Sequence, residues 1–120
     1  MAYVNGEYIL QSARTLANGL TAEPLTDGIP CKAGNSPLVV DVKVTSGTGT
    51  IKLQDSSNGF TTANTKAKTV SVTGAGTFSI TLMADIAGDQ ANYPLRNVIR
   101  LVMDTTSIVV IEEVRVCIEK

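Results

Sequence analysis

The chain has 120 residues, of which 43% are hydrophobic and 18% are charged, with 10 basic side chains, 11 acidic ones and no histidine. Such a length and apolar content predict one domain with a two-layer core and exclude a disordered tail. The net charge of −1 provides no basic surface for phosphates, so we expect no nucleic-acid binding.

The sequence carries no membrane or export signal. No stretch approaches the roughly 18 uninterrupted apolar residues of a membrane helix. Residues 1–7 lack the basic and apolar regions of a signal peptide. We therefore expect no membrane partner and synthesis in the cytoplasm. In that reducing compartment, Cys31 and Cys117 are expected to be separate thiols, with a disulfide as the alternative.

Residues 1–37 differ from the remainder, because their apolar side chains are irregularly spaced and interrupted by Asn-Gly and Asp-Gly turn signals. A helix over residues 11–20 would align several apolar residues, but Asn18-Gly19 argues against it. We predict an extended N-terminal arm with short strands at Glu7–Gln11 and residues 29–32. An ordinary first strand plus loop inside a sandwich explains the pattern equally well.

Four alternating stretches follow, with apolar side chains at every second position, which is the period of a strand with one buried face. They predict strands at 38–45, 50–55, 68–73 and 77–83. We expect a hairpin through Gly47 and Gly49 between the first two strands. A second hairpin is expected through Gly74 and Gly76 between the last two. The polar residues 56–66 are expected to form a longer loop.

Residues 84–97 are expected to cross between sheets or to carry one helical turn at residues 84–87. The strand predicted at 98–104 then forms a hairpin through Thr105-Thr106 with a final strand at 107–119. One face of strand 98–104 is apolar, whereas the other mixes Arg100 and Asp104 with two valines. Part of that mixed face is therefore expected to be covered.

The final strand changes its alternation. Val109 and Ile111 fall in one phase, and the apolar residues from Val114 onward fall in the other. Because a straight strand cannot bury both sets on one side, we predict a bulge near Glu112-Glu113 that leaves the glutamates outward. Without a bulge, residues 108–111 would be apolar on both faces, as in a central strand or a subunit contact.

These elements predict an all-β protein, namely an antiparallel β-sandwich of the jelly-roll or Ig-like type with an extended N-terminal arm. Its expected organisation is an N-terminal arm with short strands over residues 1–37 and a β-sandwich domain over residues 38–120.

The sequence contains none of the usual combinations of catalytic side chains. Without histidine, neither a Ser-His-Asp nor a Cys-His arrangement can be assembled. Asp41 and Asp55 are expected at wet strand positions or turn edges, with nothing nearby to bury them and raise a pKa. We expect Glu112 and Glu113 to be a solvated pair, and we predict no catalytic residue.

Metal, cofactor and sugar sites are also weakly indicated. Asp85, Asp89 and Asn92 offer oxygen ligands, but their spacing fits no standard calcium loop, and turn formation explains them better. Tryptophan is absent, and the rings that remain for stacking on a sugar are those of Tyr3, Tyr8, Phe60 and Tyr93. We therefore expect no cofactor and no metal, and we keep carbohydrate binding as an alternative function.

The stretches 42–57, 69–82 and 95–103, with the valine-rich final strand, resemble small β-sandwich virion proteins of tailed bacteriophages, within that group the capsid decoration (cement) type. The resemblance covers residues 38–118 and lies in strand rhythm and turn composition. It implies a non-enzymatic structural protein that binds the outside of the phage head, often as a symmetric homo-oligomer, and stabilises it. The implied partner is the major capsid protein, and the implied location is the virion after synthesis in the host cytoplasm. Tail or fibre components share this rhythm and remain an alternative.

Weak contacts repeated over a symmetric shell can bind tightly together. The candidate interface residues are Tyr3, Tyr8, Leu10, Leu16, Leu20, Tyr93, Ile108, Val109, Val110 and Ile111. The mixed face of strand 98–104 is a further candidate, and plain core is the alternative for each position. Deleting residues 1–30 is expected to leave a folded core and to weaken assembly.

Overall fold

The computed structural model describes the backbone of residues 7–11 and the whole of residues 13–118. The elements in chain order are β1 (Glu7–Gln11), β2 (Arg14–Leu16), β3 (Glu23–Pro24), β4 (Ile29–Pro30), β5 (Leu38–Ser46), β6 (Gly49–Ser56), β7 (Asn64–Val72), β8 (Gly76–Leu82), the 3-10 helix η1 (Ala87–Asn92), β9 (Val98–Thr105) and β10 (Val109–Ile118). Every strand predicted after residue 37 is present, with ends shifted by a few residues.

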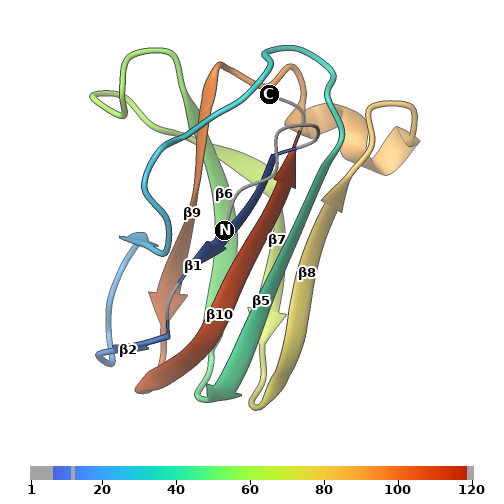
Figure 1. Ribbon diagram of the computed structural model, residues 1–120. Coiled ribbons are helices and arrows are strands. Elements are labelled where there is room, and N and C mark those ends of the chain that lie inside the picture. Colours follow the sequence, from blue (N-terminus) through green and yellow to red (C-terminus); the bar gives the residue numbers. More distant parts are fainter. Residues whose placement is uncertain (1–6, 12, 119–120) are drawn as a thin grey trace.

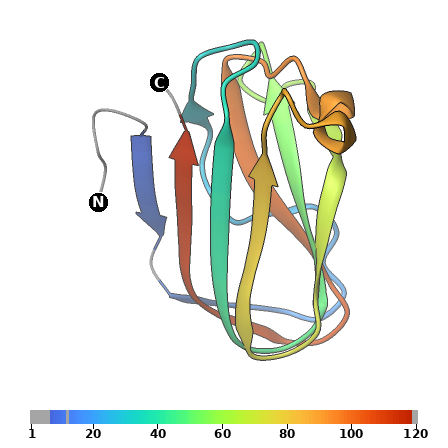
Figure 2. The same cartoon turned by 90° about the vertical axis from the view of Figure 1, so that its right-hand side faces the viewer.

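The strands form two antiparallel sheets that face each other (Figure 1). Sheet A has the order β1-β10-β5-β8, and β2 also pairs with β10. Sheet B has the order β3-β9-β6-β7, and β4 also pairs with β9. Figure 2 shows sheet A from its outer side, with β7 of sheet B beside β8 at the right-hand edge. The prediction of an all-β antiparallel sandwich is confirmed.

The strand pairs are nested around a single loop. β6 pairs with β7, β5 with β8, β3 and β4 with β9, and β1 and β2 with β10. The chain is therefore one long antiparallel ribbon, folded back at the β6–β7 loop. It is rolled up so that β10 also pairs with β5, and β9 with β6.

The three hairpins predicted from the sequence are wrong. The turns between β5 and β6, between β7 and β8, and between β9 and β10 each carry the chain from one sheet to the other. Alternation and turn glycines are the same for both kinds of connection, so neither signal separates them. The predicted crossing between β8 and β9 is confirmed, and it carries η1 slightly later than the expected turn at residues 84–87.

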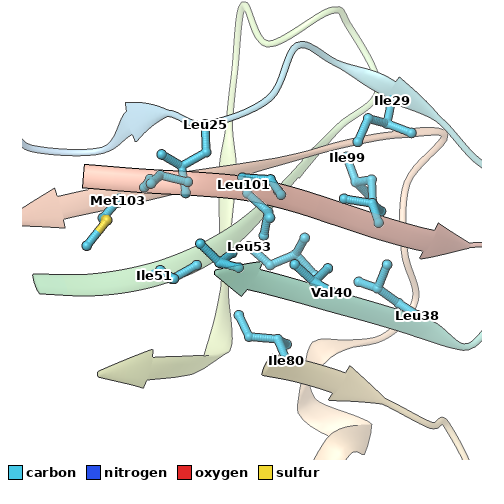
Figure 3. Close-up of a cluster of buried hydrophobic side chains, with 14 of the residues drawn as sticks. Leu25, Ile29, Leu38, Val40, Ile51, Leu53, Ile80, Ile99, Leu101 and Met103 are labelled. Atoms are coloured by element: carbon cyan, nitrogen blue, oxygen red, sulfur yellow. The ribbon is translucent and has the colours of Figure 1, made fainter. Parts of the chain in front are cut away.

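Aliphatic side chains from both sheets fill the space between them (Figure 3). On β5, the side chains of Leu38, Val40, Val42 and Val44 are at most 3% exposed, whereas the residues between them face solvent or are half-buried. Ile99, Leu101 and Met103 of β9 form the facing layer, as their alternation predicted. The period of two thus decides which residues enter the core.

The N-terminal segment forms part of both sheets. β1 has the predicted bounds, while β4 is shorter than the expected strand at residues 29–32. Leu16, Leu25 and Ile29 are 2–3% exposed and belong to the core. Residues 13–37 therefore favour the alternative of strands inside the sandwich over an extended arm.

The predicted bulge in the final strand is confirmed. The register of β10 against β5 shifts between Val110 and Ile111, and again between Ile111 and Glu113. Ile111 and Val114 are both buried, whereas Glu112 is exposed and Glu113 is half-buried. The extra residue resets the alternation, so both apolar sets of β10 face the core.

Candidate functional site

A buried carboxylate with two cationic partners lies at the end of β6. Asp55 is fully buried, because it follows Ile51 and Leu53 on the inward face of that strand. Its carboxylate lies 2.8 Å from the Lys66 ammonium and 3.1 Å from the Arg96 guanidinium. The prediction that Asp55 occupies a wet position is wrong, because its buried charge is compensated by the largely covered Lys66 ammonium and by the half-exposed Arg96 guanidinium from other segments.

Cys31 lies beside this cluster. Its Sγ donates a hydrogen bond to the Arg96 carbonyl at 3.1 Å. Burial, assisted by the negative charge of Asp55, raises the pKa of the Cys31 thiol to about 11. A neutral buried thiol is a poor nucleophile, so this cysteine has a packing role. Cys31 and Cys117 are thiols with no disulfide between them, as expected.

A second ion pair joins the open edges of the two sheets. Lys68 of edge strand β7 donates to the Thr81 carbonyl of edge strand β8 at 2.6 Å and to Asp89 of η1 at 2.9 Å. Hydrogen bonds from Lys68 and from the Met83 backbone N–H hold the pKa of Asp89 below its usual value. Inward-facing charge on an edge strand discourages pairing with a further chain, so Lys68 protects this edge.

The oxygen-rich loop considered as a calcium site is used for local structure. The Asn92 side chain accepts a hydrogen bond from the Lys68 backbone N–H and donates one to the Asp89 carbonyl. Asp85 is exposed. Among the described residues, no three histidine, cysteine or carboxylate side chains are grouped closely enough to hold a metal ion.

Two of the rings considered for sugar stacking, those of Tyr93 and Phe60, are engaged within the fold. The Tyr93 hydroxyl donates to the Ser36 carbonyl at 2.9 Å, and its ring packs against the core. The Arg100 guanidinium lies 4.3 Å from the centre of the Phe60 ring. Phe60 and its loop thus cover part of the mixed face of β9. Val102 on that face is fully buried.

The candidate interface residues of β10 and of the turn before it differ in their exposure to solvent. Val109 and Ile111 are fully buried in the core, so they are not available to a partner. Val110 is half-buried, and Ile108 is 61% exposed. Inside the predicted apolar run, Ile108 is therefore the side chain that projects into solvent, because it lies in the turn before the strand begins.

The N-terminal candidates are divided in a similar way. Leu16 is a core residue, and Leu20 packs against the core while half-buried. Tyr8 and Leu10 belong to β1, where they pair in register with Cys117 and Arg115. Tyr3 lies outside the described residues, as do the side chains of Tyr8 and Leu10.

The outer face of sheet A carries a polar hollow that sequence reasoning missed. Asp41, Lys43, Thr77, Glu113 and Arg115 line a depression of about 230 Å³ on β5, β8 and β10. Alternation places Asp41 and Lys43 outward. Their grouping with Glu113 and Arg115 depends on the pairing of β5 with β10, which lie far apart in the sequence.

Comparisons of the chain with protein-family models, with curated proteins and with solved structures find no match. Within residues 7–11 and 13–118, no helix has both the length and the apolar character needed to cross a bilayer.

Proposed function

We propose that the chain is a jelly-roll protein of a bacteriophage virion that acts without catalysis as a decoration (cement) protein. In this role it binds the major capsid protein on the outer surface of the head and stabilises the shell through contacts between subunits. The observation that carries this assignment is the nested strand pairing around the β6–β7 loop. Jelly rolls recur in viral capsid domains and lectins, and the strand rhythm resembles that of decoration proteins.

The strand order favours a jelly roll over an Ig-like sandwich. In an Ig-like domain, several strands that follow each other in sequence pair within one sheet. Here β5, β6, β7, β8, β9 and β10 alternate between the sheets except at β6–β7. A ribbon folded back once and then rolled gives this order.

Adhesion to a shell needs an exposed anchor on a rigid support, and the corner before β10 provides one. Ile108 is the most exposed of the large apolar side chains that the structure describes. Its corner is held by hydrogen bonds from the Thr48 backbone N–H to the Ser107 hydroxyl and from the Thr106 backbone N–H to the Thr48 carbonyl. A rigid corner loses little conformational freedom on binding, and repetition over a shell multiplies a weak contact.

Sedimentation with intact heads of the parent phage tests this function. We expect the purified chain to sediment with heads and to bind isolated capsid monomers weakly. Ile108→Glu should reduce the bound fraction several-fold at subsaturating concentration. The matched control is Ile86→Glu, which alters an apolar side chain of similar exposure (52%) near the η1 end of the sandwich. A wild-type chain that stays in the supernatant would end the decoration hypothesis.

The same preparation distinguishes the tail or fibre alternative, since heads and tails can be separated before sedimentation. Recovery of the chain with tails would replace the head assignment. The carbohydrate alternative receives less support, because a stacking platform needs a ring free to meet the ligand, and the rings of Tyr93 and Phe60 are both engaged within the fold. A glycan array with saturable binding would reverse this preference.

A further inference from the structure

The outer face of sheet A carries charges in a checkerboard. Glu113 of β10 lies opposite Lys43 of β5, and two residues further along, Arg115 lies opposite Asp41. Each of these two rows of cross-strand partners therefore holds one charge of each sign, and the order of the signs reverses between the two rows. Because residues directly opposite in an antiparallel pair share a face, all four side chains belong to this outer surface.

The next strand on the same face, β8, contributes neutral side chains. Thr77 of β8 lies opposite Lys43, and Ser79 lies opposite Asp41, to which its hydroxyl donates a hydrogen bond. Lys43 is half in solvent, with its ammonium 3.4 Å from Glu112. Arg115 Nε lies 2.6 Å from Glu113 along the strand. The hollow of about 230 Å³ lies among these groups and leaves room for long side chains from a partner.

We propose that a second copy of this chain docks face to face on the outer surface of sheet A. The two copies are related by a two-fold axis that runs across the strands, between the row of Lys43 and the row of Asp41. This axis places each Lys43 against the partner's Asp41 and each Glu113 against the partner's Arg115. Thr77 then faces the partner's Ser79, so hydroxyl meets hydroxyl.

Self-complementarity is the reason for choosing a second copy as the occupant. A two-fold interface brings the same patch of both subunits together, so its charges must match their own arrangement after rotation. The alternating charges on β10 and β5, and the hydroxyl groups on β8, meet this condition. A molecule measuring 35 × 29 × 27 Å also offers on one face roughly the 800 Å² that each partner of a standard interface buries.

Charge reversal measured by sedimentation velocity tests this dimer. We expect the wild-type chain to form a dimer whose affinity falls with added salt, because the matched charges are at a surface. Lys43→Glu and Asp41→Lys should each weaken dimerisation at least about tenfold, since each puts two like-charge contacts into the symmetric interface. An equimolar mixture of the two variants should recover dimer, because Glu at position 43 then faces Lys at position 41.

The matched controls are Lys32→Glu and Asp27→Lys, which make the same charge changes at exposed positions outside sheet A. Both should dimerise as the wild type does, and circular dichroism should show the same β spectrum for all variants. A wild-type chain that stays monomeric up to about millimolar concentration would overturn the proposal. A dimer that ignores both reversals, or a mixture that does not recover, would equally overturn it. This test needs no phage head, so its outcome is independent of the decoration function.

Discussion

The Asp55 carboxylate accepts two hydrogen bonds from Arg96, one from its backbone N–H at 2.9 Å and one from its guanidinium at 3.1 Å. Asp55 ends the inward-facing row of β6, and Arg96 lies in the crossing from sheet A to sheet B, just before β9. The pair therefore ties the end of a central strand to the segment that covers it. Lys66 from β7 completes the compensation of this buried charge.

Asp55→Ala should lower the free energy of unfolding by about 3–5 kcal/mol, because it leaves the Lys66 ammonium, whose side chain is only 10% exposed, without its counter-charge. Urea denaturation at neutral pH measures the loss. Asp27→Ala is the control, since that carboxylate is exposed outside the cluster and its loss should cost less than about 1 kcal/mol. Similar decreases in the free energy of unfolding for the two variants would show that the buried ion pairs of Asp55 do not stabilise the fold.

Asp89→Asn should change how stability depends on pH. A carboxylate with a depressed pKa stabilises the fold above its pKa in the unfolded chain, and this contribution is lost as the pH falls through the folded-state value. Hydrogen bonds from Lys68 and Met83 depress the pKa of Asp89. The variant should therefore be less stable at neutral pH and should lose less stability below about pH 4.

Urea midpoints collected at intervals between about pH 2 and pH 7 measure both effects of the Asp89 substitution. Asp85→Asn, at an exposed position in the same crossing, is the control and should follow the wild-type curve. If Asp89→Asn also follows that curve, the contact with Lys68 contributes nothing to acid sensitivity.

Cys31 should be alkylated more slowly than Cys117 in the native protein. The pKa of the Cys31 thiol is raised to about 11, mainly by burial, and only the thiolate reacts quickly. Iodoacetamide labelling followed by peptide mass spectrometry gives the two rates, and the same reaction in urea should bring them together. Equal native rates would contradict the burial of Cys31.

The same raised pKa predicts a pH effect at the alkaline end. A thiol whose folded-state pKa is raised stabilises the fold below its ordinary pKa of 9.0 and loses this contribution as the pH rises through about 11. Cys31→Ala should therefore show a smaller decline in stability than the wild type over that window. Thermal melts across the window measure the difference, and parallel curves would contradict it.

Strand positions and inward faces could be predicted from the sequence, because alternation has a single physical cause in the geometry of a strand. The bulge in β10 was predicted for the same reason. Strand pairing could not be predicted, since Gly47 and Gly49 suit a hairpin and a crossing equally well. A crossing is favoured here because this turn forms hydrogen bonds with the turn between β9 and β10. The sequence alone does not reveal that contact.

The ionic sites show a related limit. Asp55 shares the phase of Ile51 and Leu53, so alternation alone placed it inward, and its polarity led to the wrong expectation. Its partners Lys66 and Arg96 come from two other segments, and only the rolled ribbon brings them together. The charge pattern on the outer face of sheet A depends in the same way on the pairing of β5 with β10.

Gly47→Ala should be strongly destabilising. A Cβ at Gly47 would lie 2.5 Å from the Ile108 carbonyl oxygen, and the backbone there has φ +109°, which side chains rarely adopt. We expect a loss of at least about 2 kcal/mol in the free energy of unfolding. Gly88→Ala is the matched control, because its Cβ would meet no atom within 4 Å. Equal melting temperatures for the two variants would mean that the β5–β6 turn does not pack closely against the β9–β10 turn.

Deleting Glu112 should leave the stability of the chain nearly unchanged, whereas deleting Arg115 should strongly destabilise it. Removing Glu112 abolishes the bulge and brings Val109, Ile111 and Val114 into one phase, so the inward face is kept. Removing Arg115 instead turns the side chains of Val116 and Ile118 from the inward face to the outward face. Burial of such a side chain contributes about 1.5–3 kcal/mol, so exposing both removes a large share of the roughly 5–15 kcal/mol that stabilises a domain of this size.

Circular dichroism and thermal melts of the two deletion variants measure this difference. Each variant lacks one charged residue of β10, so the two variants have the same length and are altered in the same strand. Glu112→Ala isolates the ion pair with Lys43, whose atoms lie 3.4 Å apart at the surface, and should cost less than about 1 kcal/mol. If deletion of Glu112 lowers the melting temperature as much as deletion of Arg115 does, the bulge holds a twist that the sheet requires, and alternation alone does not govern β10.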